Sequence, residues 1–562
     1  MIVGDLKKSI QEALKTLGIE APKVELEHPA ELNHGDFSTN VALATAKIAK
    51  QKPRDIAEKV VAELQKNLPN GVKKIEVAGA GFINFYLTKG FFAEEVKNIG
   101  DDFGKNKNLE GKKVMVEYTD PNPFKPFHIG HLMSNAIGES IARLTEEEGA
   151  QVKRACWQGD IGLHVAKAIY ALLQMGDDPL NIGKLGVAYV FGAKAYETDE
   201  TAKKKIDELN QVIFEKADDA VNKLYEAGRK VSLEHFEELY KSLGTKFDYK
   251  FFEGIEGREG VPIAKQALKD GILEESDGAV VYRGEKVGLH TRVFLTSKGL
   301  PTYEAKELGL NKAKFKEEPN LDDSIIITAN EQSDYFKVVL AAMREIMPQV
   351  AGKTRHIAHG MMRFSDSKMS SRKGNVITGE SLIADVAILV HKRLADRDLS
   401  KEEKDKIAQI VAVGAIKYSI LRQAIGGDII FDFEKSISFE GDSGPYLQYS
   451  YVRAKSVLGK AESLKVQPWD GRKVEPWETT TLERLLYRFP EVVERAGAEY
   501  EPHYVTTYLT ELAGVFNSWY ANGKIIDAGD PASPYKLALT QAFAITMKNG
   551  LGLLGIKVPE KM

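Results

Sequence analysis

Hydrophobic and polar residues follow two kinds of pattern along the chain, and the change comes near residue 376. Before it, alternating segments and short apolar runs such as "KKIEVAGAGFINFYL" and "VMVEY" predict strands between amphipathic helices. After it, segments such as "AQIVAVGAIKYSILRQ", "PYLQYSYVRAKSVL" and "YVTTYLTELAGVFNSWY" have helical periodicity almost throughout. A chain of 562 residues is too long for a single core, so we expect several domains.

Residues 1–105 have the pattern of a small α+β domain. Helices are predicted near residues 5–17 and in "NVALATAKIAK" and "PRDIAEKVVAEL", and strands in "KVELEH" and in the alternating segment up to "FINFYL". The polar segment "GKNKNLEGKK" then predicts a linker.

Residues 106–375 predict an α/β domain. "VMVEY", a proline-rich loop, a helix from about Leu132 to Gly149 and the strand "VKRACW" form the opening of a parallel sheet, whose ligands bind at the carboxyl ends of the strands. A charged, helical insertion is expected at about 165–275. The strand-like "GAVVYR", "TRVFLT" and "SIIITA" then indicate that the sheet resumes. Residues 376–562 predict an all-α C-terminal domain.

Composition narrows the class of protein. Hydrophobic residues make up 43% and charged residues 28%, and no apolar run reaches the roughly 18 residues of a membrane span, so we expect no membrane association. The N-terminus lacks the pattern of a secretory signal. Cys156 is the only cysteine, which excludes an intramolecular disulfide and fits a reducing cytoplasm; we expect it to pack in a strand. With a net charge of -4, a polyanionic partner would need local basic patches.

The loop "DPNPFKPFHIGH" places His128, Gly130 and His131 where a helix begins. Gly130 leaves room for a ligand at the backbone, and the free N–H groups of a helix N-terminus attract phosphate. Two imidazoles there can donate hydrogen bonds to phosphoryl oxygens as charge develops. The spacing leaves two alternatives open: helix capping with packing, and a metal site that no nearby acidic or cysteine ligand supports.

A second loop, "FSDSKMSSRKGN" at 364–375, combines lysines, hydroxyls and a glycine. Such a loop suits a triphosphate that is held while its charge redistributes, although a solvated basic turn has the same composition.

Together these two loops resemble the HIGH and KMSKS motifs of class I aminoacyl-tRNA synthetases, as "HIGH" at 128–131 and "KMSSR" at 368–372. The wider resemblance is to the arginyl-tRNA synthetase family. "VEYTDPNPFKPFHIGHL", "QGDIGLHV", "HGDFSTNVALATAKIAK" with "VAGAGFINFYL", "SFEGDSGPYLQYSYVRAKSVL" and "KNGLGLLGIKVPEKM" are similar to segments of that family in the same order. The similarity is weakest at 165–275.

The resemblance implies a Rossmann-like catalytic domain between an N-terminal tRNA-contacting domain and a helical anticodon-binding domain. It also implies that L-arginine is activated with ATP and Mg²⁺ and passed to the terminal adenosine of tRNA(Arg). No resident metal site is expected, and we expect a cytoplasmic monomer. The implied catalytic residues are Lys125, His128, His131 and Lys368. The implied ATP-binding residues are His128, Gly130, His131, Met369, Ser370 and Ser371.

For the other substrates, the implied arginine-binding residues are Glu117, Asn122, His128, Tyr303, Glu307 and Gln332. A guanidinium with five donors is best matched by carboxylates and a hydroxyl in fixed geometry. The implied tRNA-binding residues are Tyr446, Arg453, Tyr520 and Met562. Tyr446, Tyr449 and Arg453 are spaced i, i+3 and i+7 on one helix face, where aromatic and guanidinium planes can stack on bases.

The chain departs from the family pattern at three positions. Ser371 stands where the second lysine of KMSKS is expected, and Lys125 occupies an upstream position that is thought to compensate. Glu307 replaces the usual Asp, and His164 replaces a glutamine. Two alternatives remain open on the sequence: a non-catalytic RNA-binding relative, against which His128, His131 and Lys368 argue, and a nucleotidyltransferase, which would not need the long helical C-terminus.

Overall fold

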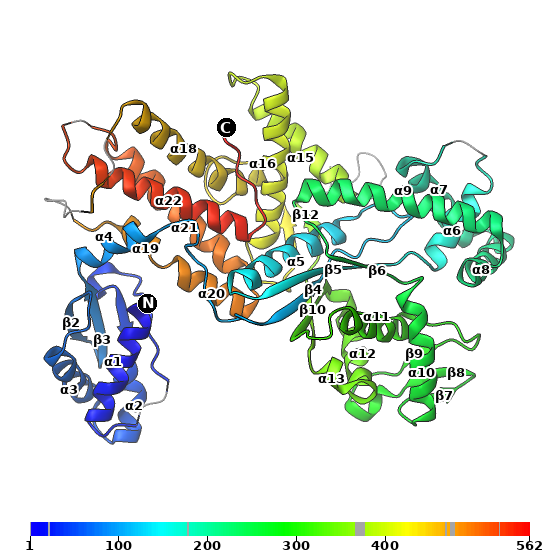
Figure 1. Cartoon of the computed structure of the whole chain (residues 1–562), viewed down its shortest axis with the longest axis horizontal. Coiled ribbons are helices and arrows are strands. Elements are labelled where there is room, and N and C mark those ends of the chain that lie inside the picture. The colour runs from blue at the N-terminus through cyan, green and yellow to red at the C-terminus, as the bar shows by residue number, and fades with distance from the viewer. Residues whose placement is uncertain are drawn as a thin grey trace. The chain divides into compact units, whose positions relative to one another are not determined.

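The structure is a computed structural model that describes residues 2–20, 23–176, 179–365, 377–466, 469–471, 478–527 and 529–562. The chain forms two compact units (Figure 1). One contains residues 1–103, 454–489 and 514–546, and the other contains residues 104–453, 490–513 and 547–562.

The larger unit is built on a parallel five-stranded sheet. Its strands, in spatial order, are β11 (Thr354–His359), β10 (Asp323–Ala329), β4 (Lys113–Glu117), β5 (Gln151–Gln158) and β6 (Tyr249–Phe252). The central strands are apolar and buried, as expected for a parallel sheet covered on both faces. Because the strands are parallel, the loops that follow them meet at one edge of the sheet.

Two helices pack against the middle of this sheet. The first, α5 (Ile129–Glu147), contacts β4, β5 and β10, and most of its residues are buried. The second, α11 (Tyr303–Glu317), places Leu310 in an apolar cluster with Met115 of β4 and Trp157 of β5.

The prediction of a helical insertion at 165–275 is only partly correct. Its helices are α6 (Leu163–Leu172), α7 (Ile182–Thr198), α8 (Glu200–Glu215), α9 (Asp219–Leu243) and α10 (Gly260–Lys269). However, β6 comes from the same stretch and extends the parallel sheet beside β5.

The prediction that three strands resume the core sheet is correct only for "SIIITA", which is β10. The other two, β8 (Ala279–Tyr282) and β9 (Arg292–Leu295), belong to a separate antiparallel sheet in which β8 lies between β7 (Glu274–Ser276) and β9. β8 and β9 are each four residues long, whereas β10 has seven residues with four consecutive buried ones, as expected for a strand inside a parallel sheet.

Further elements complete the larger unit. They are α12 (Ser333–Ile346), α13 (Pro348–Ala351), α15 (Gly379–Arg393), α16 (Lys401–Leu421), α17 (Phe433–Ser436), η2 (Glu256–Glu259), η3 (Gly284–Val287) and η4 (Asn330–Gln332). β13 (Ile429–Phe431) pairs with β12 (Met362–Phe364), so a short strand lies within the region predicted to be all-α. The helices α18 (Gly444–Ser463), α20 (Phe489–Glu499), α21 (His503–Ala521) and α22 (Ser533–Leu553) each have residues in both units.

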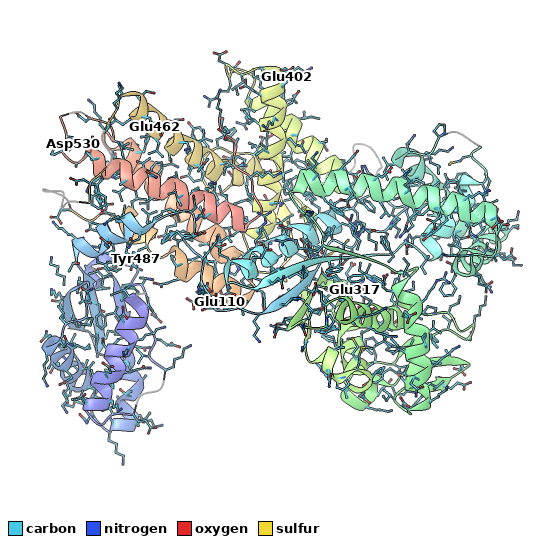
Figure 2. The ribbon with its side chains drawn as sticks, viewed as in Figure 1. Glu110, Glu317, Glu402, Glu462, Tyr487 and Asp530 are labelled. Atoms are coloured by element: carbon cyan, nitrogen blue, oxygen red, sulfur yellow. The ribbon has the colours of Figure 1, made fainter. Side chains whose placement is uncertain are left out.

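The smaller unit holds the N-terminal residues. Its antiparallel sheet has the order β1 (Phe37–Thr39), β3 (Phe82–Leu87) and β2 (Val72–Ala78). Its helices are α1 (Ile2–Thr16), α2 (Val41–Ala49), α3 (Pro53–Lys66), α4 (Lys89–Asn98) and α19 (Thr481–Leu486), with η1 (Leu32–His34). Tyr487, labelled in Figure 2, packs in the same core against Phe37 and Phe92. The strand expected in "KVELEH" is reduced to a bridge between Glu27 and Ser38.

No helix in the described part of the chain is long and apolar enough to cross a membrane.

Candidate active site

The loop between β4 and α5 is held in an unusual conformation. Thr119, Asp120 and Phe124 have positive φ angles of 80°, 47° and 66°, a strained region for residues other than glycine. Hydrogen bonds with β5 and α9 fix it. Asp120 accepts the Trp157 N–H at 2.7 Å, and the Phe124 N–H donates to the Ser232 hydroxyl at 3.0 Å. Strain that is maintained by such contacts is typical of binding loops.

The loop delivers His128 to the N-cap of α5, beside His131 in its first turn. The two imidazole rings stack with centroids 3.4 Å apart. The His128 backbone N–H donates to Nδ1 of His131 at 3.3 Å, so His131 carries its proton on Nε2. A β-carbon at Gly130 would lie 3.1 Å from the His128 ring, which is tighter than ordinary contact, so glycine lets the ring lie against the backbone.

Both histidines are neutral at physiological pH. Desolvation and the nearby Lys125 ammonium lower the pKa of His128 to about 4. Burial, followed by His128 and Lys125, lowers the pKa of His131 well below its usual value. Neutral imidazoles can donate a hydrogen bond to a phosphoryl oxygen, while the positive charge comes from Lys125.

His164, the residue in the family's glutamine position, lies in the same neighbourhood. Its Nε2 is 2.8 Å from the carbonyl oxygen of Gly159, so Nε2–H donates and Nδ1 keeps a lone pair. Burial first, and then Lys125, lowers the pKa of His164 to about 3. The ammonium group of Lys125 itself lies 5.3 Å from the ring centroid of Tyr189 on α7. Lys125 is thus the shared positive charge of this part of the site.

A cluster of buried carboxylates lies at the carboxyl edge of the sheet, where the sequence predicted the arginine pocket. Glu117, the last residue of β4, forms an ion pair with Lys314 of α11, and both side chains are buried. Glu307, one turn into the same helix, accepts a hydrogen bond from Nδ2 of Asn311 at 3.3 Å. Burial and the Glu117 carboxylate raise the pKa of Glu307 to about 8, against the opposing effect of Lys314. The predicted partners Glu117 and Glu307 are therefore close enough to influence each other.

Two further carboxylates complete the cluster. Glu253, directly after β6, pairs with Lys306 at 2.5 Å. Burial and Glu117 raise the pKa of Asp120 well above its usual value. The amide oxygen of Asn122 lies so close to Gly159 that a β-carbon there would be 2.3 Å from it. Asn122 is thus in contact with the loop that follows β5.

The remaining predicted arginine-binding residues lie on the rim. Tyr303 begins α11, has 63% of its surface exposed, and lies with its ring centroid 5.1 Å from the Lys306 ammonium. Gln332 ends η4, after β10, and is exposed. The predicted set therefore comes from the end of β4 and the loop that follows it, from η4 after β10, and from the first turns of α11.

Sequence reasoning missed Asn311, Lys314, Asp120, Glu253 and Lys306. The signals were available for two of them, because Asn311 and Lys314 follow Glu307 at i+4 and i+7 and so share its helix face. Glu253 could not be found before β6 was recognised as a core strand.

The second motif falls outside the described residues, and with it Lys368, Met369, Ser370 and Ser371. The chain that follows is bonded to the first motif. Thr378 forms an isolated bridge with His128, and the Gly379 N–H donates to the Phe127 carbonyl at 2.8 Å. Glu380, in the first turn of α15, pairs with His235 of α9 at 2.8 Å. The start of α15 (Gly379–Arg393) is therefore fixed beside the HIGH residues.

The predicted tRNA-binding residues divide between the two units. In the larger unit, the guanidinium of Arg453 lies 4.8 Å from the ring centroid of Tyr449, which confirms that these side chains share a face of α18. Tyr446 and Met562 are half-buried. In the smaller unit, Tyr520 is 39% exposed, with its ring centroid 6.4 Å from that of Phe516.

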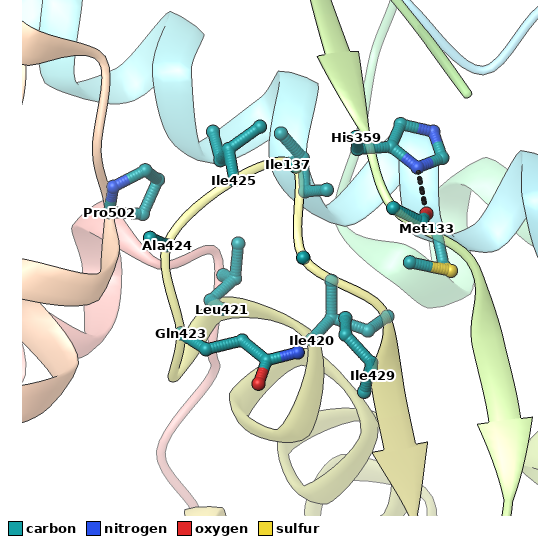
Figure 3. Close-up of a pocket in the computed structure, with 13 residues that line it drawn as sticks. Met133, Ile137, His359, Ile420, Leu421, Gln423, Ala424, Ile425, Ile429 and Pro502 are labelled. Carbon is teal, nitrogen blue, oxygen red and sulfur yellow. Dashed lines mark hydrogen bonds between the residues drawn. The ribbon is translucent and has the colours of Figure 1, made fainter. Parts of the chain in front are cut away.

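A separate hollow lies where α5 meets α16 (Figure 3). It is lined largely by apolar side chains, including Met133, Ile137 and Leu421, and no described residue of the predicted site lines it. In the described part of the chain, no group of three or more His, Cys, Asp or Glu side chains is arranged to hold a metal ion.

Family models match three successive segments of the chain. They are described as an arginyl tRNA synthetase N-terminal domain at residues 4–87, a tRNA synthetases class I (R) catalytic domain at 96–433, and a DALR anticodon binding domain at 447–562. An arginine–tRNA ligase of Clostridium perfringens is 31% identical over 99% of this chain and 100% of its own length. One of Limosilactobacillus reuteri is also 31% identical, over 99% of this chain and 98% of its own.

Solved structures agree with these matches. The Thermus thermophilus arginyl-tRNA synthetase superposes with a TM-score of 0.80 at 25% identity, covering 99% of both chains. That of Plasmodium falciparum gives 0.79 at 20% identity over 99% of this chain and 98% of its own, a likeness of fold. The matches span almost the whole chain and include the catalytic domain that carries the geometry described above. The chain belongs to the arginyl-tRNA synthetase family of class I aminoacyl-tRNA synthetases.

Proposed function

We propose that this protein is an arginine–tRNA ligase that activates L-arginine with ATP and transfers it to the 2′-OH of the terminal adenosine of tRNA(Arg). The observation that carries the proposal is the pairing of two sites at one sheet edge. Buried carboxylates around Glu117 and Glu307 suit a guanidinium, and neutral His128 and His131 at a helix N-terminus suit a triphosphate.

The first step needs no nucleophile from the protein. The carboxylate of arginine attacks the α-phosphorus of ATP, a new P–O bond forms, and the bond to pyrophosphate breaks. Positioning and charge stabilisation are then the whole task of the protein. His131 presents Nε2–H as a donor, because its Nδ1 already accepts the His128 N–H. Lys125, and Lys368 in the second motif, supply positive charge as the phosphate becomes more negative.

In the second step the 2′-OH of the terminal adenosine attacks the carbonyl carbon of the adenylate, and AMP leaves. Mg²⁺ enters with ATP as part of the substrate. Such an ion is bound mainly through phosphate oxygens and water, so it does not require a cage of protein ligands. Gly130, Met369, Ser370 and Ser371 are proposed to complete the nucleotide site.

Recognition of arginine rests on the positive charge and the planar shape of its guanidinium group. The guanidinium has five donors in one plane, which the carboxylates of Glu117 and Glu307 accept, while Asn122, His128, Tyr303 and Gln332 hold the rest of the amino acid. Glu307 is one methylene longer than the family's Asp. Its buried position on α11 and its hydrogen bond from Asn311 give the longer side chain a fixed orientation.

For the RNA, Tyr446, Arg453, Tyr520 and Met562 are proposed to contact the tRNA, with Arg453 and Tyr449 offering adjacent guanidinium and aromatic planes. We propose that the protein works as a monomer in the cytoplasm.

The test is aminoacylation of bulk tRNA with each amino acid, with lysine and citrulline as the critical comparisons. Lysine has the positive charge of arginine but not its planar guanidinium group, whereas citrulline has a similar planar group but no charge. We expect arginine alone to be transferred efficiently. Pyrophosphate exchange should be measured with and without tRNA, since the family resemblance predicts that tRNA is required. Transfer of another amino acid, or no transfer at all, would contradict the proposal.

A further inference from the structure

One face of α11 carries three buried polar side chains. Glu307, Asn311 and Lys314 follow one another at i, i+4 and i+7, so they lie in one row along the helix. Glu307 is 5% exposed, and Asn311 and Lys314 are 0% exposed. Lysine is rarely buried to this extent unless it is paired. Lys314 is paired, with Glu117 at the end of β4.

The polar atoms of this row are not fully satisfied. Oε2 of Glu117, Nζ of Lys314 and Oδ1 of Asn311 are buried and have no hydrogen-bond partner among the described residues, apart from the ion pair itself. A buried ion pair with so few additional hydrogen bonds contributes little to stability, because desolvation of the two charges offsets their attraction. Stability alone therefore does not explain why a lysine lies here.

The charge balance of the pocket gives a better explanation for the buried Lys314. Glu117, Lys314 and Glu253 act on the charge of Glu307, and Glu307 acts in turn on Asp120 and Tyr335. Lys306 joins the cluster through its ion pair with Glu253. Within this set and Glu307, four carboxylates face two lysines. Each missing positive charge in a buried site favours protonation of a carboxyl group. The number of lysines thus controls how many carboxylates are ionised when a cationic substrate arrives.

We propose that Lys314 is a positioning residue for arginine recognition: it fixes Glu117 by a direct ion pair and keeps the pocket charged for a single guanidinium. The inference rests on the proposed function. Lys314 does not touch the substrate, because two cations repel. Glu117 and Glu307, held by Lys314 and Asn311, contact the guanidinium, and Oδ1 of Asn311 accepts one of its N–H groups.

Electrostatic effects on the neighbouring carboxyls are consistent with this role. Lys314 opposes the increase in pKa that burial and Glu117 produce at Glu307 and at Asp120. Without Lys314, both groups would hold their protons to higher pH, and arginine would have to displace them. A lysine with a purely structural role would change stability without moving the pH dependence of arginine binding.

The test replaces Lys314 with methionine, which keeps most of the volume and removes the charge. The matched control is Lys312→Met on the same helix, where the lysine is 52% exposed and pairs with Glu259 at 3.2 Å. Lys314→Met is expected to raise KM for arginine at least about tenfold and to shift its pH dependence upward by about one unit, with KM for ATP changed less than about threefold. Lys312→Met is expected to behave as wild type.

A second variant covers the case in which Lys314→Met does not fold, which thermal melting would reveal. Lys314→Arg keeps the charge but enlarges the group that holds Glu117. It is expected to raise KM for arginine while leaving the pH dependence as in wild type. If the variant that folds keeps the wild-type KM for arginine, the inference is wrong.

The wild-type protein separates this inference from the proposed function. If wild type fails to transfer arginine to tRNA, the proposed function fails. If wild type transfers arginine and folded Lys314→Met has the same arginine KM and pH profile, only the role of Lys314 is overturned.

Discussion

Glu117 and Tyr118 are neighbours in the sequence, yet they lead into two different polar clusters. Successive side chains of a strand point to opposite faces of the sheet. Tyr118 donates a hydrogen bond to Glu139 of α5 at 2.5 Å, whereas Glu117 pairs with Lys314 of α11. Both clusters are buried, and both contain carboxylates and cations. Comparing them shows how a structural cluster differs from a candidate binding site.

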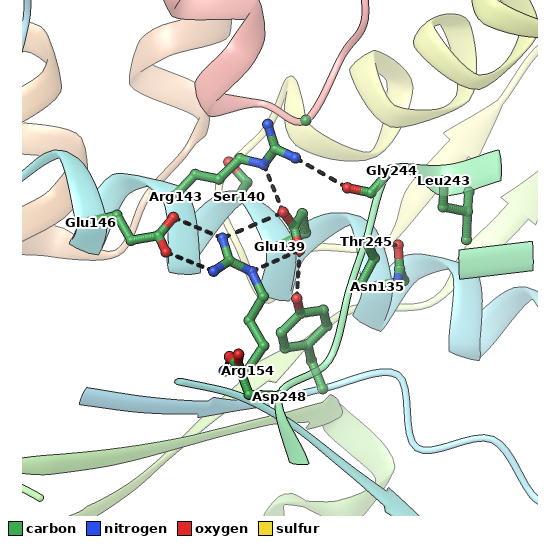
Figure 4. A network of polar contacts seen from close by, with 12 residues as sticks. Asn135, Glu139, Ser140, Arg143, Glu146, Arg154, Leu243, Gly244, Thr245 and Asp248 are labelled. Carbon is green, nitrogen blue, oxygen red and sulfur yellow. Dashed lines mark hydrogen bonds and ion pairs between the residues drawn. The ribbon is translucent and has the colours of Figure 1, made fainter. Parts of the chain in front are cut away.

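The cluster around Glu139 is saturated, as Figure 4 shows. Glu139 accepts hydrogen bonds from Arg143 at 2.7 Å and from Arg154 at 3.2 Å, in addition to that from Tyr118. Arg154 also pairs with Glu146 at 2.7 Å. Burial would raise the pKa of Glu139, but the two guanidinium groups and the phenol outweigh it and lower the pKa below its usual value. This carboxylate is ionised and has all the partners it needs.

The cluster around Glu117 and Glu307 is acidic and unsaturated. The pKa of Glu307 is raised and buried polar atoms of Glu117, Asn311 and Lys314 lack hydrogen-bond partners among the described residues. Groups of this kind are costly unless something else completes them. A buried cluster whose carboxylates have all their hydrogen-bond partners stabilises the fold. A buried acidic cluster that lacks some of these partners is suited to bind a cation.

The largest effect is expected from breaking the saturated cluster. Glu139→Gln removes the charge that two guanidinium groups share, so the free energy of unfolding should fall by about 3–5 kcal/mol, while the folded variant keeps its arginine KM within about threefold. Glu146→Gln is the control. Glu146 is 41% exposed and meets only one of these arginines, so its loss should cost about 0–1 kcal/mol. Urea denaturation measures both; equal effects would mean that the network is not centred on Glu139.

In the unsaturated cluster, the same chemical change should act on activity. Glu307→Gln removes one acceptor for the guanidinium, and kcat/KM for arginine should fall by the equivalent of about 2–5 kcal/mol with little change in ATP binding. The control is Glu317→Gln, at the exposed C-terminal turn of α11 and labelled in Figure 2. A kcat/KM within about threefold of wild type would show that Glu307 does not bind arginine.

Much of this contrast could be predicted from the sequence. The loop after "VMVEY", the N-terminus of α5 and the meeting of the loops at one sheet edge follow from periodicity and from the rules for parallel sheets. Glu117, Glu307 and the histidines were identified by family resemblance. What the sequence did not reveal was which charged residues are buried. "YEAKELGLNKAKFKEE" has the composition of an exposed helix, yet Glu307, Asn311 and Lys314 are inside.

Strand β6 was not predicted from the sequence for a related reason. "YKFF" is short and includes an exposed lysine, so nothing local distinguishes it from the charged helices around it. It becomes a strand because β5 offers an unpaired edge, which is a non-local condition. Glu253 and the ion pair with Lys306 could not be placed until that pairing was known.

A change of pH should separate the clusters without any mutation. Glu307, with its pKa raised to about 8, is largely protonated at pH 6.5 and must lose its proton to accept the guanidinium. KM for arginine should therefore fall roughly tenfold as pH rises from 6.5 to 8. Glu139 is ionised throughout this range, so the stability it contributes should not change. Arginine KM measured across this range checks the expectation; a flat profile would mean that Glu307 does not titrate there.

The smallest effects come from two hydroxyl deletions, one in each cluster. Tyr118→Phe removes one of the donors to Glu139, but Arg143 and Arg154 still occupy the carboxylate, so no acceptor is left alone. The free energy of unfolding should fall by about 1 kcal/mol, and arginine KM should stay at its wild-type value.

Tyr335→Phe is the matched change on the other side of the sheet. The Tyr335 hydroxyl donates to the Tyr303 carbonyl at 3.0 Å and so anchors the first residue of α11, the helix that carries Glu307 and Lys314. Loosening that anchor should raise arginine KM about two- to fivefold, because small displacements of charged partners weaken a buried contact more than they weaken the fold. Arginine KM and urea denaturation, measured on both variants, give a two-way comparison. If Tyr118→Phe raised arginine KM as much as Tyr335→Phe, the two clusters would act on the same property, and saturation would not distinguish a structural cluster from a binding site.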